Sequence, residues 1–139
     1  MTVSTETENI AVLKRSYEWA NKAMDGSGHP VTRAQVERFF AADAKMATND
    51  KVKCTGIDAH VEHFTEIQKK TREVVFHPFE TIVAQGDRVG VYFKIDVLYS
   101  DGRNAKIIVC GVFQLRDRKI VNFTEVAHFE GDELHLENH

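Results

Sequence analysis

Four long apolar runs fill the second half of the chain and predict an antiparallel β-sheet. They are rich in Val, Ile, Phe and Tyr and cover Val74–Ala84, Arg88–Tyr99, Asn104–Leu115 and Lys119–Phe129. The first two breaks between them contain Asp and Gly, the residues that tight hairpin turns need. Strands of this length joined by short turns form a meander that curls as it twists. This curled sheet is the predicted wall of any site in the protein.

The first half of the chain shows helical spacing instead. Ile10, Leu13, Tyr17, Ala20 and Met24 recur every three or four residues, which predicts an amphipathic helix that ends at the glycines just beyond.

Two shorter helices and a small hairpin are predicted after this first helix. Thr32 and Gln35 form a capping box at the start of the second helix, and Thr55 is the predicted N-cap of the third. Between them, short strands surround an Asn49-Asp50 turn.

These elements predict an α+β fold in which a curved antiparallel β-sheet wraps around three N-terminal helices. Residues 1–8 are the predicted flexible N-terminus, residues 9–130 the single domain, and residues 131–139 an acidic tail.

One strand carries a signal about assembly. The segment Ile107–Phe113 is apolar at every position, whereas a strand buried on one face alternates apolar with polar residues. Helices cover only the concave side of the sheet. We therefore expect a homodimer that forms through the convex side.

Composition narrows the class of protein. With 139 residues and a net charge of −3, the chain lacks the basic surface that nucleic acids or anionic membranes attract. Cys54 and Cys110 both lie in predicted strands and are expected to be buried thiols. The N-terminus lacks a signal-peptide pattern, and no apolar run approaches the roughly 20 residues of a membrane span. We expect a soluble, cytoplasmic protein.

Several motifs resemble the nuclear transport factor 2-like superfamily, and most closely its SnoaL-like group. They are FAADA at Phe40–Ala44, TGIDA at Thr55–Ala59, QGDRVGV at Gln85–Val91 and VFQLRDRKIV at Val112–Val121. The resemblance extends over Asn9–Phe129 and depends on the order and spacing of the motifs.

The resemblance implies a cone-shaped, cystatin-like fold, usually dimeric, with a hydrophobic pocket between sheet and helices. The superfamily contains ketosteroid isomerases, polyketide cyclases, epoxide hydrolases, dehydratases and non-catalytic members, so the fold does not settle the function. The residues expected to line the pocket are Trp19, Phe40, Phe64, Val109, Phe113 and Phe123.

Ketosteroid isomerases use a tyrosine and two carboxyl groups. Tyr17 matches the tyrosine, but the carboxyl positions fall near Thr48 or Asn49 and near Gly111, none of which has a carboxyl group. Steroid isomerisation is therefore not expected.

SnoaL-like cyclases place an aspartate near the end of the last strand, and here His128 occupies that place. Histidine can transfer protons near neutral pH, although the residue could equally serve only to cap the strand. Glu125 has the opposite parity, so only one of the two faces the pocket unless a bulge intervenes. The favoured arrangement has Glu125 pointing outward, at the dimer face.

The sequence thus predicts a protein that binds a small apolar molecule. If it is an enzyme, His128 transfers the proton while Tyr17, Trp19 and Glu125 orient the ligand. The expected reaction is then an isomerisation, cyclisation, dehydration or hydrolysis, and none of these needs a cofactor. No metal site is expected, since His60 and His63 lack the i, i+4 spacing of helical zinc ligands. The alternative is a non-catalytic ligand-binding or assembly module.

Overall fold

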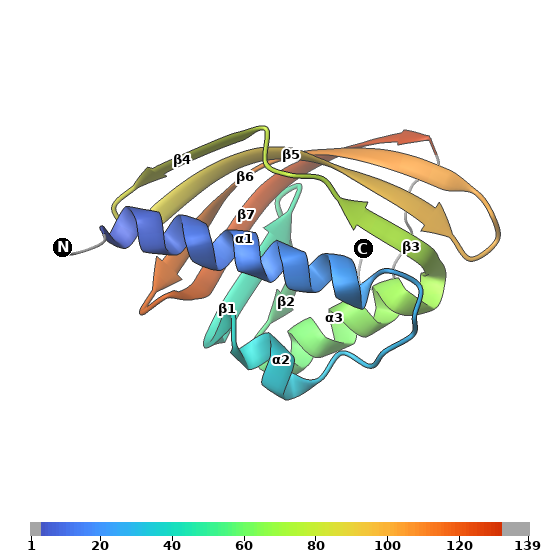
Figure 1. The fold of residues 1–139 in the computed structure, drawn as a ribbon, viewed down its shortest axis with the longest axis horizontal. Coiled ribbons are helices and arrows are strands. Elements are labelled where there is room, and N and C mark those ends of the chain that lie inside the picture. Colours follow the sequence, from blue (N-terminus) through green and yellow to red (C-terminus); the bar gives the residue numbers. More distant parts are fainter. Residues whose placement is uncertain (1–3, 132–139) are drawn as a thin grey trace.

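The computed structural model describes residues 4–131, which form a curled sheet with helices on its concave side (Figure 1). The helices are α1 (Thr5–Ala23), α2 (Arg33–Glu37) and α3 (Ile57–Lys70); the strands are β1 (Phe40–Thr48), β2 (Lys51–Thr55), β3 (Thr71–Phe76), β4 (Thr81–Gln85), β5 (Arg88–Tyr99), β6 (Asn104–Arg116) and β7 (Lys119–Gly131). The predicted α+β class is confirmed.

The sheet is mixed, not purely antiparallel. Its strand order is β2-β1-β7-β6-β5-β3, and β4 also pairs with β5. The pair β1 and β7 is parallel, while every other pair is antiparallel. The Ile120 N–H donates to the Phe39 carbonyl over 2.8 Å, so the chain leaves α2 already beside the start of β7. This parallel contact brings the first hairpin against the last strand.

The first predicted long strand is interrupted. Instead of one strand over Val74–Ala84, β3 ends at Phe76 and β4 begins at Thr81. Pro78 lies in the break. It has no N–H to donate to a neighbouring strand, and it restricts the backbone conformation of the residue before it, so it interrupts the strand. Both strands pair with β5, so the break produces a short excursion of the chain at residues 77–80.

Helix α1 begins earlier than the sequence indicated. Ser4 is its N-cap and accepts a hydrogen bond from the Thr7 N–H over 3.1 Å. Residues 4–8 are therefore not a loose segment, since the cap satisfies an amide of the first turn and Glu6 and Glu8 favour the helix dipole there.

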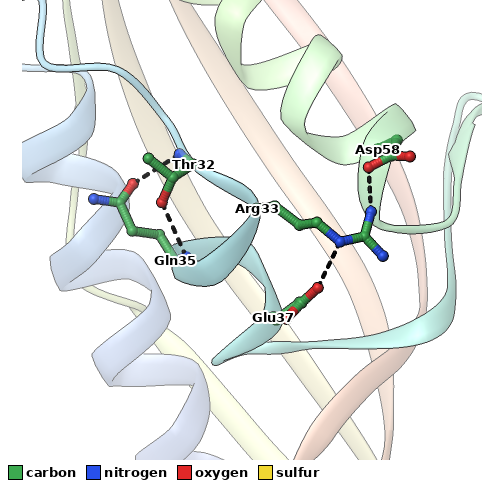
Figure 2. A network of polar contacts seen from close by, with 5 residues as sticks. All are labelled: Thr32, Arg33, Gln35, Glu37 and Asp58. Atoms are coloured by element: carbon green, nitrogen blue, oxygen red, sulfur yellow. Dashed lines mark hydrogen bonds and ion pairs between the residues drawn. The ribbon is translucent and has the colours of Figure 1, made fainter.

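Figure 2 shows how the short helix α2 is held. The predicted capping box is confirmed: the Gln35 N–H donates to Thr32 Oγ1, and the Thr32 N–H donates to Gln35 Oε1. Arg33 pairs with Glu37 on the same helix and with Asp58 at the start of α3. The network ties the starts of the two helices together.

The start of α3 differs from the prediction. Gly56, with φ of +89°, is the N-cap in place of Thr55, and no side chain caps the helix. His60, one turn into the helix, is almost fully buried, and Nδ1 lies 2.7 Å from the Gly56 carbonyl oxygen. Nδ1 therefore carries the proton, and His60 has a structural role.

The two faces of β6 differ in burial. Ile107, Val109 and Phe113 are buried under the helices, whereas Cys110 and Val112 are exposed on the convex face. Cys110 is thus not the buried thiol that was expected, while burial of Cys54 raises its pKa to about 12. The convex side of β6 is open within this chain.

Across residues 4–131, no helix combines the length and apolar character that a membrane crossing requires.

Candidate functional site

Glu125 points into the space between sheet and helices, and His128 points away from it. From Phe123 to Gly131, β7 pairs with β6 in regular register, so residues three apart face opposite sides. Glu125 is half-buried and His128 is exposed. The expectation that Glu125 points outward and that His128 lines the pocket is wrong.

A one-residue bulge accounts for this reversal. Leu115 pairs with Ile120, but Gln114 pairs with Asn122, so Val121 is an extra residue in β7. Ile120 is buried under the helices. Without the bulge, the parity of Ile120 would have carried His128 inward and Glu125 outward. An inserted residue swaps every later side chain to the other face.

The parallel neighbour β1 supplies a partner for the Glu125 carboxyl group. Thr48 is opposite Glu125 in the register, and its hydroxyl donates to Oε1 over 2.8 Å. Burial raises the pKa of Glu125 to about 6, while the Thr48 hydrogen bond and the positive charge of Lys53 oppose the rise. Glu125 can therefore change protonation near neutral pH.

Gly111 makes room for this arrangement. It is the cross-strand partner of Glu125 on β6, and a Cβ there would lie 2.7 Å from Phe123 Cε1 and 3.0 Å from Glu125 Cβ. Gly111 is also where the isomerase resemblance asks for a carboxyl group. In this chain the carboxyl group next to that position belongs to Glu125, the partner of Gly111 on the neighbouring strand β7.

Tyr17 faces this region from α1. Its ring meets Phe76, Phe93 and Phe113 edge to face, with centroids 5.4, 5.1 and 6.2 Å away. Burial raises the pKa of Tyr17 well above its usual value, and the nearby charge of Glu125 raises it further. The Tyr17 phenol therefore stays protonated near neutral pH and is a hydrogen-bond donor within electrostatic range of an ionisable carboxyl group.

An apolar cavity of about 60 Å³ lies between α1, α3 and the sheet. It is lined by Ser16, Tyr17, Trp19, Ala20, Phe40, Phe64, Phe76, Phe113 and Ile120.

The structure brings most of the predicted pocket residues together there. Trp19, Phe40, Phe64 and Phe113 line the cavity, and Phe123 stacks on Phe113 with ring centroids 3.8 Å apart. Val109 is instead a fully buried core residue and does not line the cavity.

A wider groove of about 380 Å³ runs along the outside of the same aromatic wall. Tyr17 and Phe76 line both the groove and the cavity. Phe79, in the excursion between β3 and β4, packs edge to face on Tyr17 with centroids 5.0 Å apart. Tyr17 and Phe76 therefore stand between the cavity and the groove, and Phe79 covers Tyr17 on the groove side.

Sequence reasoning missed the supporting residues Thr48, Asn49 and Lys53. The sequence singles out Thr48 and Asn49 only as positions without a carboxyl group, and no pattern in it pairs β1 with β7. Among residues 4–131, no three His, Cys, Asp or Glu side chains are grouped closely enough to hold a metal ion.

Comparison with known proteins shows the fold. No protein-family model matches the sequence, and no curated protein matches it. A protein from a Jannaschia species named as a SnoaL-like polyketide cyclase is 14% identical, with a TM-score of 0.70 over 91% of this chain and 90% of that one. A nuclear transport factor 2-like protein from Anabaena variabilis is 16% identical, with a TM-score of 0.70 over 95% and 96%.

A third similar structure is an epoxide hydrolase of M. tuberculosis, 18% identical, with a TM-score of 0.66 over 90% of this chain and 86% of that one. The chain thus has the fold of SnoaL-like and nuclear transport factor 2-like proteins, as the resemblance implied. Proteins with this degree of structural similarity are named for different activities, so the fold alone does not identify a reaction.

Proposed function

We propose that the protein is an enzyme that binds a small, largely apolar molecule with a carbonyl or hydroxyl group, and that Glu125 transfers a proton to or from it. The observation that carries the proposal is the inward carboxyl group of Glu125, whose pKa burial raises to about 6. A base with a pKa just below neutral pH is mostly ionised, roughly 90% at pH 7, and still holds an abstracted proton.

Tyr17 complements this base. When Glu125 removes a proton from carbon beside a carbonyl group, the C–H electrons move to the carbonyl oxygen, which gains negative charge. A protonated phenol can donate a hydrogen bond to that oxygen. Glu125 then returns the proton at another carbon, which isomerises the substrate. Alternatively, the carbonyl re-forms as a C=C bond forms and the bond to a leaving group on the next carbon breaks, and Glu125 gives the proton to that leaving group; this reaction is an elimination. Glu125 thus takes the role first predicted for His128, and no cofactor enters these steps.

The size of the cavity restricts the ligand. Ligand sites usually enclose about 300–1,000 Å³, far more than the cavity between α1, α3 and the sheet. Space for a ligand of even moderate size in this cavity requires Tyr17 or Phe76 to move, which would join the cavity to the groove. A compact, apolar ligand matches the aromatic lining.

The second candidate is a non-catalytic binding module of the same fold. The small volume of the cavity favours it, because the cavity must widen before a ligand fits, and a carrier that widens for its ligand needs no chemistry. The hydrogen bond from Thr48 would then serve only to satisfy a buried carboxyl group.

A homodimer through the convex face is part of the proposal. Paired residues form an outer stripe across six strands, consisting of Val83, Gly90, Val112, Thr124, Ala47 and Val52. Val83, Val112 and Val52 are 63%, 43% and 57% exposed within the chain. A second copy related by two-fold symmetry would cover each stripe with the other.

Glu125→Gln and Tyr17→Phe test the enzyme proposal. The wild-type protein is incubated with a panel of small ketones, epoxides and β-hydroxy ketones, and both product formation and the ligand-induced rise in melting temperature are recorded. We expect Glu125→Gln to lower turnover about 10²–10⁴-fold while the melting shift persists. Tyr17→Phe should lower kcat less. Binding without turnover, or turnover that survives Glu125→Gln, would favour the binding module.

A further inference from the structure

Two asparagine side chains make the same unusual contact with the sheet. Asn49 donates from Nδ2 to the Ala127 carbonyl over 3.1 Å and accepts from the Ala127 N–H over 3.0 Å. Asn21, on α1, makes the matching pair with Phe76 at 3.0 and 2.7 Å. In each case the side-chain amide makes the pair of backbone hydrogen bonds that a neighbouring strand would otherwise make. The two contacts lie at different ends of the sheet, and only one adjoins Glu125.

Asn49 also holds Glu125 through its backbone. The last residues paired between β1 and β7 are Thr48 and Glu125, and beyond them the chain turns away at Asn49 and Asp50. There the Asn49 N–H donates to the Glu125 carbonyl over 3.0 Å. Three hydrogen bonds from one residue therefore continue the contact of β1 with β7 past the end of the strand.

The position suits asparagine for physical reasons. Asn49 has φ of +49° and Asp50 has φ of +66°, the left-handed conformation that a two-residue hairpin turn requires. Asparagine tolerates this conformation better than most residues. Its amide supplies one donor and one acceptor side by side. Aspartate keeps the acceptor but loses the donor, and glycine keeps only the conformation.

We propose that Asn49 is a positioning residue: by fastening the β1–β2 turn to β7, it holds the Thr48 hydroxyl against the Glu125 carboxyl group and keeps water away from that carboxyl group. This inference rests on the proposed function, in which Glu125 transfers the proton. Asn49 itself touches the backbone of β7 and not the carboxyl oxygens.

The other titratable groups that interact with Glu125 come from different elements. Lys53 on β2 lowers its pKa, and the phenol of Tyr17 on α1 lies close enough to feel its charge. A change at Asn49 leaves both groups in the protein. A shift in the titration of Glu125 would then report on hydration and on the Thr48 contact.

The test is a ¹³C NMR titration of the Glu125 carboxyl carbon in the full-length protein, compared between wild type, Asn49→Gly and Asn21→Ala. Asn49→Gly removes both side-chain bonds to Ala127 and leaves the turn conformation free of strain. Water reaching the carboxyl group lowers the pKa of Glu125, whereas loss of the Thr48 hydrogen bond alone would raise it. Because burial is the larger of the two causes, we expect the pKa to fall from about 6 by about half a pH unit or more. Asn21→Ala removes the same two bonds elsewhere and should lower the melting temperature without moving this pKa.

A pKa of Glu125 that is unchanged in Asn49→Gly, with a melting temperature that falls as in Asn21→Ala, would overturn the inference and leave Asn49 a merely stabilising residue. If Asn49→Gly does not fold, Asn49→Ser keeps one hydrogen-bonding group and should show a smaller shift in the same direction. Failure of the proposed function is seen separately, as turnover that survives Glu125→Gln.

Discussion

The two faces of β7 carry different kinds of residue for different purposes. On the inner face, Phe123 and Glu125 sit in a crowded space shared with aromatic rings and the backbone of Gly111. On the outer face, Val126 is 65% exposed and His128 is open to solvent. Burial of a carboxyl group on the inner face lowers the stability of the fold. On the outer face, apolar surface is left exposed within the single chain. The proposed proton-transfer site would account for the first feature, and the proposed dimer interface would account for the second.

The largest expected effect is on dimerisation, and it comes from a charge placed on the outer face of β7. Val126→Lys places a charge beside Cys110, its cross-strand partner next to the outer stripe. A buried, unpaired ammonium in a dimer interface should weaken dimerisation about 100-fold, while the fold of each chain is unchanged. Sedimentation velocity over a micromolar concentration range measures this. A wild-type protein that stays monomeric throughout that range would contradict the proposed dimer.

Two glycines offer a matched comparison of the faces. Gly111 faces inward, and a Cβ there would lie 2.8 Å from the Thr124 carbonyl oxygen as well as close to Phe123. Gly90 faces outward, and its Cβ would meet only the exposed side chain of Val83 closely, at 3.2 Å. We expect Gly111→Ala to cost roughly 1–3 kcal/mol of unfolding free energy. Gly90→Ala should cost the single chain less than about 0.5 kcal/mol, because Val83 is exposed within one chain and its side chain can rotate away.

Urea unfolding curves of the two variants provide this measurement. Equal losses would show that the inner face is no more tightly packed than the outer one, and would remove the explanation for glycine at position 111.

The buried carboxyl group predicts a pH-dependent difference between wild type and Glu125→Gln. The folded-state pKa of Glu125 is raised from 4.5 to about 6, so the folded protein binds more protons than the unfolded chain between these values. This group therefore lowers stability as the pH rises through that window, by about 2 kcal/mol in all. Glu125→Gln lacks this loss and should be the more stable protein above pH 6, although it is the less active one.

Urea unfolding of both proteins at pH 4.5 and at pH 7.5 checks the prediction. Burial lowers the pKa of His60, which destabilises the fold as the pH falls below about 6.5. His60 is present in both proteins, so their difference isolates Glu125. A difference that does not change with pH would mean that Glu125 is not desolvated.

The sequence predicts the positions of the strands better than it predicts which side chains the sheet places next to one another. The bounds of β5, Arg88–Tyr99, follow directly from its apolar run and the turns on either side. The parallel pairing of Thr48 with Glu125 joins residues 77 positions apart, and no local pattern encodes it. Alternation correctly separates Glu125 from His128. It cannot decide which of them faces inward, because that depends on the extra residue at Val121, whose bulge has no sequence marker such as Gly or Pro.

The smallest expected effect is on the outer face, at the residue that resemblance to cyclases selected for catalysis. His128 is exposed and pairs with Ile108 across β6, on the side of the sheet away from Tyr17 and the cavity. His128→Ala should change kcat/KM less than twofold and the unfolding free energy by less than about 0.5 kcal/mol, as is usual for exposed positions. Kinetics on any substrate found for the wild-type protein measure the first quantity, with Glu125→Gln, which the proposed function makes nearly inactive, as the reference. A large loss of kcat in His128→Ala with an unchanged fold would place the reaction on the outer face, and the bulge at Val121 would then have no bearing on the chemistry.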